Sequence, residues 1–283
     1  MLTDKIRLSG PETNDPEDIL SSSLGVIFPD DITNQHGDAT SSVIYLSPLF
    51  GPLTLSLADP QGQDNRRLFS HFLWNAGLQL AEFIEEGKDD QGRHWNVKGE
   101  EVLELGAGTG LAGLVAGLTG GRRVAISDYP AKEVLENIRA NVERNVPPLR
   151  SKFPGIGEIE VQGHEWGVLD DKFSKSNEGR FGRILVADCL WMPWQHLNLL
   201  KSISHFLKEE GKAWVVAGFH TGREKMRGFY EEEKLRELGL EIERIWERNA
   251  EGVEREWVTD RGIEDVTRRK RWLVCAILRK RRG

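Results

Sequence analysis

The stretch Glu104-Leu105-Gly106-Ala107-Gly108-Thr109-Gly110-Leu111 decides the fold, because it joins an apolar run to a helical pattern. Residues 100–106 (EEVLELG) predict a short strand, and residues 111–120 (LAGLVAGLTG) predict a helix closed by glycine. Glycines at a strand-to-helix turn let the backbone bend sharply and let a ligand approach closely. We therefore expect a ligand-binding site where this strand ends.

Strand and helix patterns alternate downstream of this turn, which predicts a parallel sheet with helices on both faces. The charged interval 248–267 is expected to contain no helix and to join the last two strands as an antiparallel pair through a long loop. The expected elements are strands at 122–128, 159–167, 183–191, 213–219, 241–247 and 271–279, and helices at 131–146 (ended by Pro147 and Pro148), 197–211 and 226–239, with surface loops at 147–158 and 170–180.

The chain upstream of the glycine turn divides into two parts. Residues 1–42 are rich in Ser, Asp, Pro, Asn and Thr, and we expect them to form a mobile N-terminal arm. Residues 43–59 predict a hairpin or two short strands, and residues 68–87 predict a helix. Residues 43–283 are therefore expected to form a single α/β domain with an N-terminal strand and helix extension.

Composition places the chain among ordinary globular proteins. Its 283 residues include 39% apolar and 29% charged residues, and its formal charge of -7 argues against a protein that mainly coats nucleic acid. Only two cysteines, Cys189 and Cys275, are present, which indicates free thiols in a reducing compartment. No apolar run approaches the ~18 residues of a membrane span, so we expect a cytoplasmic protein without a membrane anchor.

Two acidic residues indicate what the glycine turn binds. Glu104 lies two positions before Gly106, where it would repel a pyrophosphate but would suit a ligand with an amino group and a sulfonium charge. Asp128 ends the next strand, 22 residues after Gly106, where a carboxylate can accept hydrogen bonds from both ribose hydroxyls. The alternative role for Asp128 is the N-cap of the helix that opens near Pro130.

The motifs ELGAGTGL (104–111), SDY (127–129), HEWG (164–167) and LVADCLW (185–191) occur in this order. In this arrangement they resemble the seven-strand S-adenosylmethionine-dependent methyltransferases. More narrowly, LWNAG (73–77) makes the chain similar to the family-16 lysine methyltransferase-like branch, including its fungal nicotinamide N-methyltransferase-like members. The resemblance implies a Rossmann-like seven-stranded sheet of order 3-2-1-4-5-7-6 with an antiparallel seventh strand, over about residues 43–280.

The same resemblance implies a cofactor site for S-adenosyl-L-methionine. The methionine part would lie along the glycine turn beside Glu104, the ribose would be held by Asp128, and aromatic and small side chains would enclose the adenine. For the tryptophans in this set, core packing is the alternative. The implied residues are Trp74, Glu104, Gly106, Ala107, Gly108, Asp128, Trp166 and Ala187.

The acceptor side departs from the family pattern. Many lysine-methylating relatives carry WDAA where this chain has Trp74-Asn75-Ala76-Gly77, and Asp-x-x-Tyr where this chain has Asp188-Cys189-Leu190-Trp191. Asp188 is the candidate to bind and deprotonate an acceptor amine, although it could instead cap the next helix or order the loop.

Three further residues are candidates around the acceptor. Trp191 and Trp194 are candidates for an apolar substrate lip, with core packing as the alternative. His220 is a candidate secondary base, or else an ordinary loop histidine.

Eight basic residues and no acid lie within residues 267–283. Solvated charge at the ends of an edge-proximal strand is the simplest interpretation, and a nuclear import signal or an acidic docking partner is the alternative. No Cys/His spacing indicates a metal site, and no hydrolase elbow is present.

The leading hypothesis is an N-methyltransferase for a protein lysine or N-terminus, whose acidic body would receive a basic substrate. Methylation of a small amine such as nicotinamide, and a non-catalytic cofactor-binding scaffold, are the alternatives.

Overall fold

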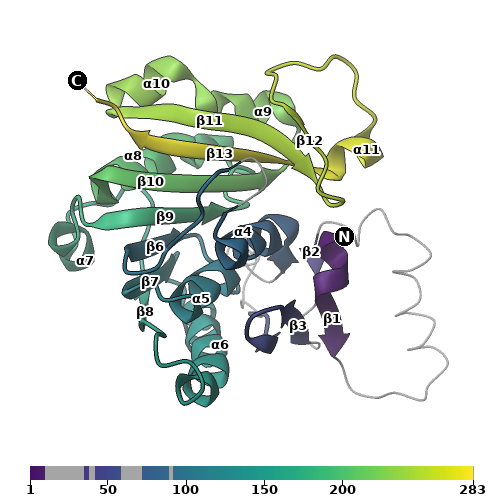
Figure 1. The fold of residues 1–283 in the computed structure, drawn as a ribbon. Helices are drawn as coiled ribbons and strands as arrows, with labels where there is room; N and C mark the ends of the chain where they lie inside the picture. The colour runs from purple at the N-terminus through teal and green to yellow at the C-terminus, as the bar shows by residue number, and fades with distance from the viewer. Residues whose placement is uncertain (10–34, 38–41, 59–71, 89–91, 283) are drawn as a thin grey trace.

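The computed structural model describes residues 1–9, 35–37, 42–58, 72–88 and 92–282. Its centre is an eight-stranded sheet of order β12-β11-β13-β10-β9-β6-β7-β8 (Figure 1). The strands are β6 (Glu101–Leu105), β7 (Arg123–Asp128), β8 (Glu158–Gly163), β9 (Phe181–Ala187), β10 (Leu207–Gly218), β11 (Leu240–Asn249), β12 (Glu254–Glu256) and β13 (Trp272–Lys280).

The predicted strand order is confirmed. The five strands from β8 to β10 pair in parallel, whereas β13 pairs antiparallel with both β10 and β11. Taken in chain order without β12, the sheet is 3-2-1-4-5-7-6 with an antiparallel seventh strand. The carboxyl ends of β6, β7, β9 and β10 consequently meet at one edge of the sheet.

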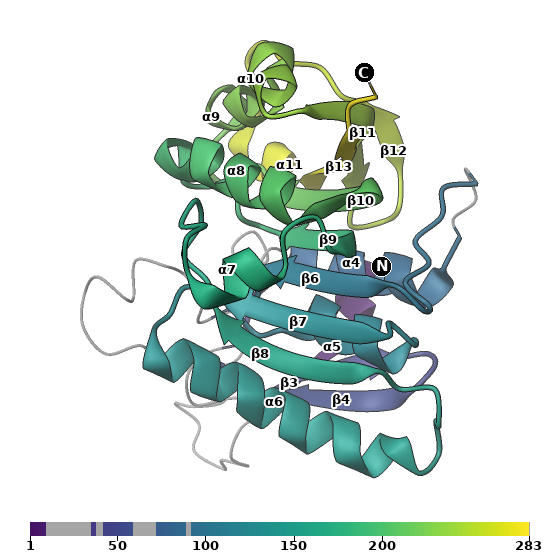
Figure 2. The same cartoon turned by 90° about the vertical axis from the view of Figure 1, so that its left-hand side faces the viewer.

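Helices cover both faces of the sheet, as the alternating pattern predicted. Figure 2 shows α6 beside β8 and β4 near one end of the sheet and α8 beside β10 near the other. One face carries α4 (Asn75–Glu86), α5 (Leu111–Leu118) and α6 (Lys132–Arg150), and the other carries α7 (Lys172–Ser176), α8 (His196–Phe206), α9 (Arg223–Arg227), the 3-10 turn η3 (Gly228–Tyr230) and α10 (Glu232–Glu237).

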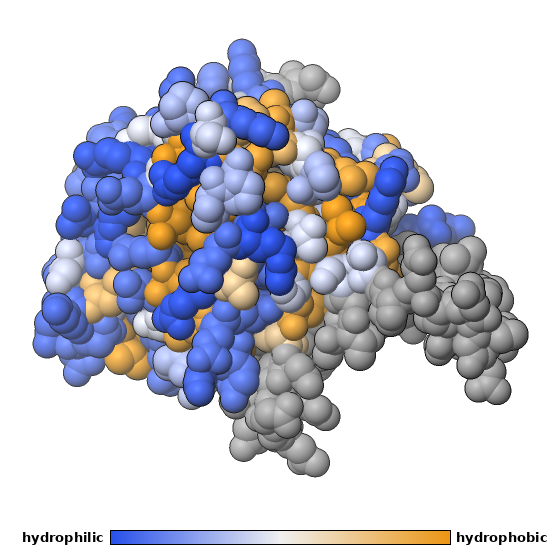
Figure 3. Space-filling model, turned by 90° about the horizontal axis from the view of Figure 1, so that it is seen from below, coloured by the Kyte–Doolittle hydropathy of each residue, from blue (hydrophilic) through white to orange (hydrophobic). Residues whose placement is uncertain are grey.

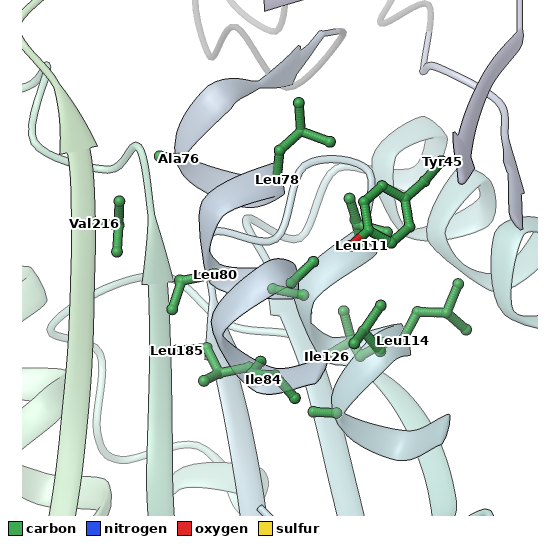
Figure 4. Close-up of a cluster of buried hydrophobic side chains, with 14 of the residues drawn as sticks. Tyr45, Ala76, Leu78, Leu80, Ile84, Leu111, Leu114, Ile126, Leu185 and Val216 are labelled. Carbon is green, nitrogen blue, oxygen red and sulfur yellow. The ribbon is translucent and has the colours of Figure 1, made fainter. Parts of the chain in front are cut away.

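Two hydrophobic cores lie on the two faces, because successive side chains of a strand point to opposite sides. Along β13, Leu273 and Cys275 belong to the core under α4 and α5, whereas Val274 and Ala276 belong to the core under α8 and α10. Figure 4 shows the first core, in which apolar side chains of α4 lie between the sheet and α5.

The N-terminal region differs from the expected mobile arm at residues 2–9. These residues form the 3-10 turn η1 (Leu2–Lys5) and strand β1 (Ile6–Ser9), which pairs with β3 (Ser42–Ser47), and β3 pairs in turn with β4 (Gly51–Leu55). Leu2 is buried and its backbone N–H donates to the oxygen of Ala250, so tertiary contacts order a segment whose composition is polar. Residues 35–36 of the expected arm also form a strand, β2 (Gln35–His36), whereas residues 10–34 and 38–41 lie outside the described residues.

Several predicted boundaries were wrong, and tertiary packing explains most of them. The helix expected to end before Pro147 continues to Arg150, because Val146 is buried and Leu149 packs against the core. The helix expected at 197–211 ends at Phe206, where β10 begins to pair with β9. The helix expected at 226–239 is divided into α9, η3 and α10. The strand expected at 183–191 ends at Ala187. The loop expected at 170–180 contains α7.

The interval 248–267 was expected to lack helices, yet it contains β12 and α11 (Val266–Lys270). A buried carboxylate anchors this region to the sheet: Glu247 of β11 is fully buried and forms ion pairs with Arg223, Arg255 and Arg261. Arg223 also pairs with Glu264, which precedes α11. Part of the charge that suggested a solvated loop is therefore neutralised by ion pairs that join the interval to the sheet.

The described surface seen from below mixes charged and apolar side chains (Figure 3). None of the described helices combines the length and the apolar composition that crossing a membrane requires.

Candidate active site

A pocket lies at the sheet edge where the parallel strands end. This is the position of ligand sites in open α/β sheets. The structure brings ten of the twelve predicted site residues into its wall: Trp74, Glu104, Gly106, Ala107, Gly108, Asp128, Trp166, Ala187, Asp188 and Trp191.

The glycine turn adopts a backbone that other residues rarely accept. Gly106, Gly108 and Gly110 have φ angles of 70°, 56° and 78°, in the left-handed region. A Cβ at Gly106 would also lie 2.6 Å from Cys189 Sγ and 2.8 Å from Trp166 Cζ2. Glycine is therefore required at position 106 both by the turn and by the side chains that pack over it.

Glu104 is buried at the base of the pocket, and its Oε2 accepts a hydrogen bond of 2.9 Å from the backbone N–H of Gly113. Burial, with a smaller contribution from the nearby Asp128 carboxylate, raises the pKa of this carboxyl to about 8, although the hydrogen bond from Gly113 favours the ionised form. Among the described residues, no lysine or arginine forms an ion pair with Glu104. A Cβ at Gly113 would lie 2.5 Å from Glu104 Oε2, so the glycine at position 113 leaves room for this carboxyl.

Asp128 holds the glycine turn through both of its carboxylate oxygens. Oδ2 accepts from the backbone N–H of Gly108 at 2.7 Å, and Oδ1 accepts from that of Tyr129 at 2.7 Å. Burial raises the pKa of Asp128 to about 6, although these two hydrogen bonds favour the ionised form. The alternative role as a helix cap is wrong, because the N-cap of α6 is Ala131 and no side chain caps that helix.

Trp166 is held over the glycine turn by contacts that the sequence did not reveal. The backbone N–H of Gly167 donates to Ser202 Oγ at 2.9 Å, and His164 Nε2 lies 2.9 Å from the same oxygen. Burial lowers the pKa of His164 to about 4, so this ring is neutral near pH 7. The HEWG turn is thereby anchored to α8, and Trp166 lines the pocket instead of lying in a closed core.

Asp188 is the only described residue other than glycine with a left-handed backbone, at φ 57°. Its Oδ1 accepts from the backbone N–H of Gly218 at 3.0 Å, and its Oδ2 lies 3.0 Å from His220 Nε2. It caps neither of the next two helices, because Met192 and Gln195 are their N-caps. The carboxylate therefore orders the loop and also faces the pocket.

His220 and Trp194 are the two predicted site residues outside the pocket wall. His220 lies behind Asp188, and its ring centroid is 4.6 Å from that of Trp74. Trp194 is 72% exposed and meets Trp191 edge to face at 6.4 Å, so the core-packing alternative is wrong for Trp194. Trp191 itself is partly buried in the wall.

The sequence interpretation missed several residues of the wall. Cys189 is buried beside Gly106, and burial raises the pKa of its thiol well above the ordinary value, so it is a packing residue and not a nucleophile. Its place directly after Asp188 was the signal that could have identified it. The other missed side chains include Tyr129, Met192 and Gln195, which follow strand ends and come together only in the fold.

Comparisons with known proteins agree with this geometry. The family model described as lysine methyltransferase matches residues 43–235. A protein N-terminal and lysine N-methyltransferase EFM7 from Gibberella zeae is 30% identical over 208 residues, which cover 70% of this chain and 74% of that protein. Proteins of the same name from Kluyveromyces lactis and Candida glabrata are 29% and 32% identical, over 68% and 63% of this chain and 66% of each relative. The chain belongs to the lysine methyltransferase family.

Proposed function

We propose that this methyltransferase transfers a methyl group from S-adenosylmethionine to an amine of a protein, either a lysine side chain or an N-terminus. The observation that carries the proposal is one pocket with buried carboxylates at its base and a third carboxylate, Asp188, beside its aromatic wall. The names of the EFM7 relatives support a protein amine as the acceptor.

The pocket fits this cofactor because its two buried carboxyl groups, Glu104 and Asp128, can interact with cationic and hydroxyl groups of a ligand. Glu104 is a buried carboxyl without a basic partner among the described side chains, and a ligand ammonium or sulfonium would offset the cost of ionising it. Each oxygen of Asp128 accepts one backbone N–H and retains a further lone pair for a ribose hydroxyl. Gly106, Ala107 and Gly108 would lie along the methionine part.

The adenine side of the pocket is apolar. Trp166 and Ala187 would form flat walls against the base, and Trp74 would close the pocket near the transferred group. When bound, the cofactor would supply an electrophilic methyl group: an amine lone pair bonds to the methyl carbon while the C–S bond breaks and the sulfur leaves as a neutral thioether. The protein's own contribution is to position the two groups and to exclude water.

Asp188 would act on the acceptor. An amine must lose its proton before its lone pair can attack, and Asp188 is fixed by Gly218 and His220 with lone pairs left for an incoming N–H. Trp191 would flank the amine, and the exposed Trp194 would contact the rest of a protein substrate.

The experiment is a methylation screen with the full-length protein. Labelled S-adenosylmethionine is incubated with the protein and a eukaryotic lysate, and in parallel with a panel of small amines that includes nicotinamide. Labelled protein bands, mapped by mass spectrometry to a lysine or an N-terminus and absent with Asp188→Asn, are expected. Label only on a small amine would identify a small-molecule enzyme, and cofactor binding without any transfer would identify a scaffold.

We also propose a cytoplasmic location, because Cys189 and Cys275 are both free and buried, as in proteins of reducing compartments. Microscopy of the tagged full-length chain tests this location. Accumulation in the nucleus that depends on the basic residues 268–271 would instead identify them as an import signal.

A further inference from the structure

A short N-terminal strand contacts the wall of the active site. Strand β2 (Gln35–His36) pairs antiparallel with β5 (Leu73–Trp74), with His36 opposite Leu73. β2 lies before residue 43, where the match to the lysine methyltransferase family begins. A segment outside the matched region therefore pairs with Trp74, which lines the pocket.

A buried side-chain hydrogen bond reinforces this pairing. His36 is 5% exposed, Asn75 is 4% exposed, and His36 Nε2 lies 2.8 Å from Asn75 Oδ1. Burial lowers the pKa of His36, so its ring is neutral and its Nε2–H donates to the amide oxygen. Strand β2 thus contacts β5 twice, through backbone pairing with Leu73 and Trp74 and through the hydrogen bond from His36 to the residue that follows Trp74.

Trp74 in turn packs against His220, the residue that contacts the Asp188 carboxylate. The rings of Trp74 and His220 have centroids 4.6 Å apart and planes tilted by 57°. His220 Nε2 lies 3.0 Å from Asp188 Oδ2, while Asp188 Oδ1 accepts from Gly218. The contacts from β2 to Asp188 are therefore continuous.

Asp188 needs such support because its backbone is in the left-handed region, which L-residues rarely adopt. Two interactions determine the direction of its carboxylate: the Gly218 N–H and the His220 ring. A shift of His220 would rotate one of the two oxygens away from the position that an acceptor amine requires.

We propose that β2 positions the acceptor side of the active site. His36 holds Trp74, Trp74 packs against His220, and His220 holds Asp188, so His36 and His220 are positioning residues. The assignment deepens the proposed function, because it concerns the acceptor side of the same pocket. It replaces the idea of His220 as a secondary base, since His220 lies outside the pocket wall and its Nε2 is occupied by Asp188.

The charges around His220 agree with a positioning role. Burial disfavours its protonated form, but the Asp188 carboxylate on the loop after β9 favours it, and Lys270 of α11 opposes it. The net effect raises the pKa of His220, so the charged form of the ring, which pairs with the Asp188 carboxylate, persists to a higher pH than in an isolated histidine.

The test compares His36→Ala with the wild type, with His36→Gln as the conservative variant that can still donate to Asn75 and the exposed His94→Ala as the matched control. The first readout is the NMR titration midpoint of His220, assigned by its loss in His220→Gln, with S-adenosylhomocysteine present. Loosening Trp74 lets His220 shift away from Asp188, the carboxylate that raises this midpoint, so His36→Ala is expected to lower it, whereas His36→Gln and His94→Ala leave it near the wild-type value. A midpoint that His36→Ala moves by less than about 0.1 would overturn the proposal.

The second readout is acceptor kinetics at saturating cofactor. His36→Ala and His220→Gln are each expected to lower kcat/KM about tenfold, and the double variant to lose less than the product of the two, because both act on Asp188. Multiplicative losses, or unchanged kinetics in His36→Ala, would overturn the catalytic role of β2. If the wild type transfers no methyl group, the proposed function fails, while the His220 midpoint still decides whether β2 positions this histidine.

Discussion

Replacing Glu104 by glutamine is expected to stabilise the protein and to weaken cofactor binding. The buried carboxyl has a pKa raised to about 8, against 4.5 for an unperturbed group. Above pH 4.5 the unfolded chain releases a proton that the folded chain retains, so stability falls as the pH rises from about 4.5 to 8. Glutamine keeps an acceptor for Gly113 and removes this dependence.

The magnitude follows from the size of the pKa difference. A difference of about 3.5 between folded and unfolded states corresponds to at most about 4 kcal/mol at pH 8, and nothing at pH 4. Because one kcal/mol moves the melting temperature of a chain this long by about 2 °C, Glu104→Gln should raise Tm by several degrees at pH 8.

Glu104→Gln should weaken cofactor binding, although it stabilises the fold. A cofactor cation next to Glu104 lowers its pKa, so the wild type should release a proton on binding, and its affinity should increase with pH up to about 8. Glu104→Gln should lose about 1.5–3 kcal/mol of affinity at pH 8, the value of a hydrogen bond to a charged group.

Thermal melts at pH 5 and pH 8, and calorimetry with S-adenosylhomocysteine in buffers of different ionisation enthalpy, measure these effects. Glu101→Gln is the matched control: burial opposes its ionisation, but Arg180 and Arg122 lower its pKa overall, so this change should destabilise the protein at pH 8. The reasoning is refuted if Glu104→Gln melts at a lower temperature than the wild type at pH 8. It is also refuted if this variant binds S-adenosylhomocysteine as tightly as the wild type and with the same proton release.

Three further predictions concern the glycine turn and the two aspartates. Gly106→Val should lower the free energy of unfolding by about 2–4 kcal/mol and abolish cofactor binding, because the φ of 70° and the contacts with Cys189 and Trp166 both oppose a side chain. Circular dichroism melts and calorimetry measure the two effects, and tight cofactor binding by this variant would contradict the prediction. Asp128→Ala should weaken cofactor binding by about 1.5–3 kcal/mol, measured by calorimetry on protein shown to be folded; unchanged affinity would remove the ribose assignment. Asp188→Asn should leave cofactor affinity nearly intact and lower single-turnover methylation by about 10²-fold, and a fully active variant would exclude the general-base role.

Local sequence patterns predicted most of the sheet, the glycine turn and the acids Glu104, Asp128 and Asp188, whereas Trp74, Trp166 and Ala187 were implied by the family resemblance; all of these residues line the pocket. Strand periodicity, the glycine turn and the acids at strand ends are properties of neighbouring residues, and parallel strands place their carboxyl ends at one edge. The prediction failed where distant contacts override local preference. Leu2 is ordered by packing near Ala250, and the last turn of α6 persists past Pro147 because Val146 is buried.

The sequence by itself determined that a glycine turn joins a strand to a helix, that acids lie at strand ends, and therefore that these groups gather at one edge of the sheet. Only the tertiary structure decided which side chains hold those acids. Asp128 meets Gly108 across 20 residues, Asp188 meets His220 across 32, and His36 meets Asn75 across 39. Such pairs depend on how the sheet closes and where the helices pack, and no local pattern encodes those distances.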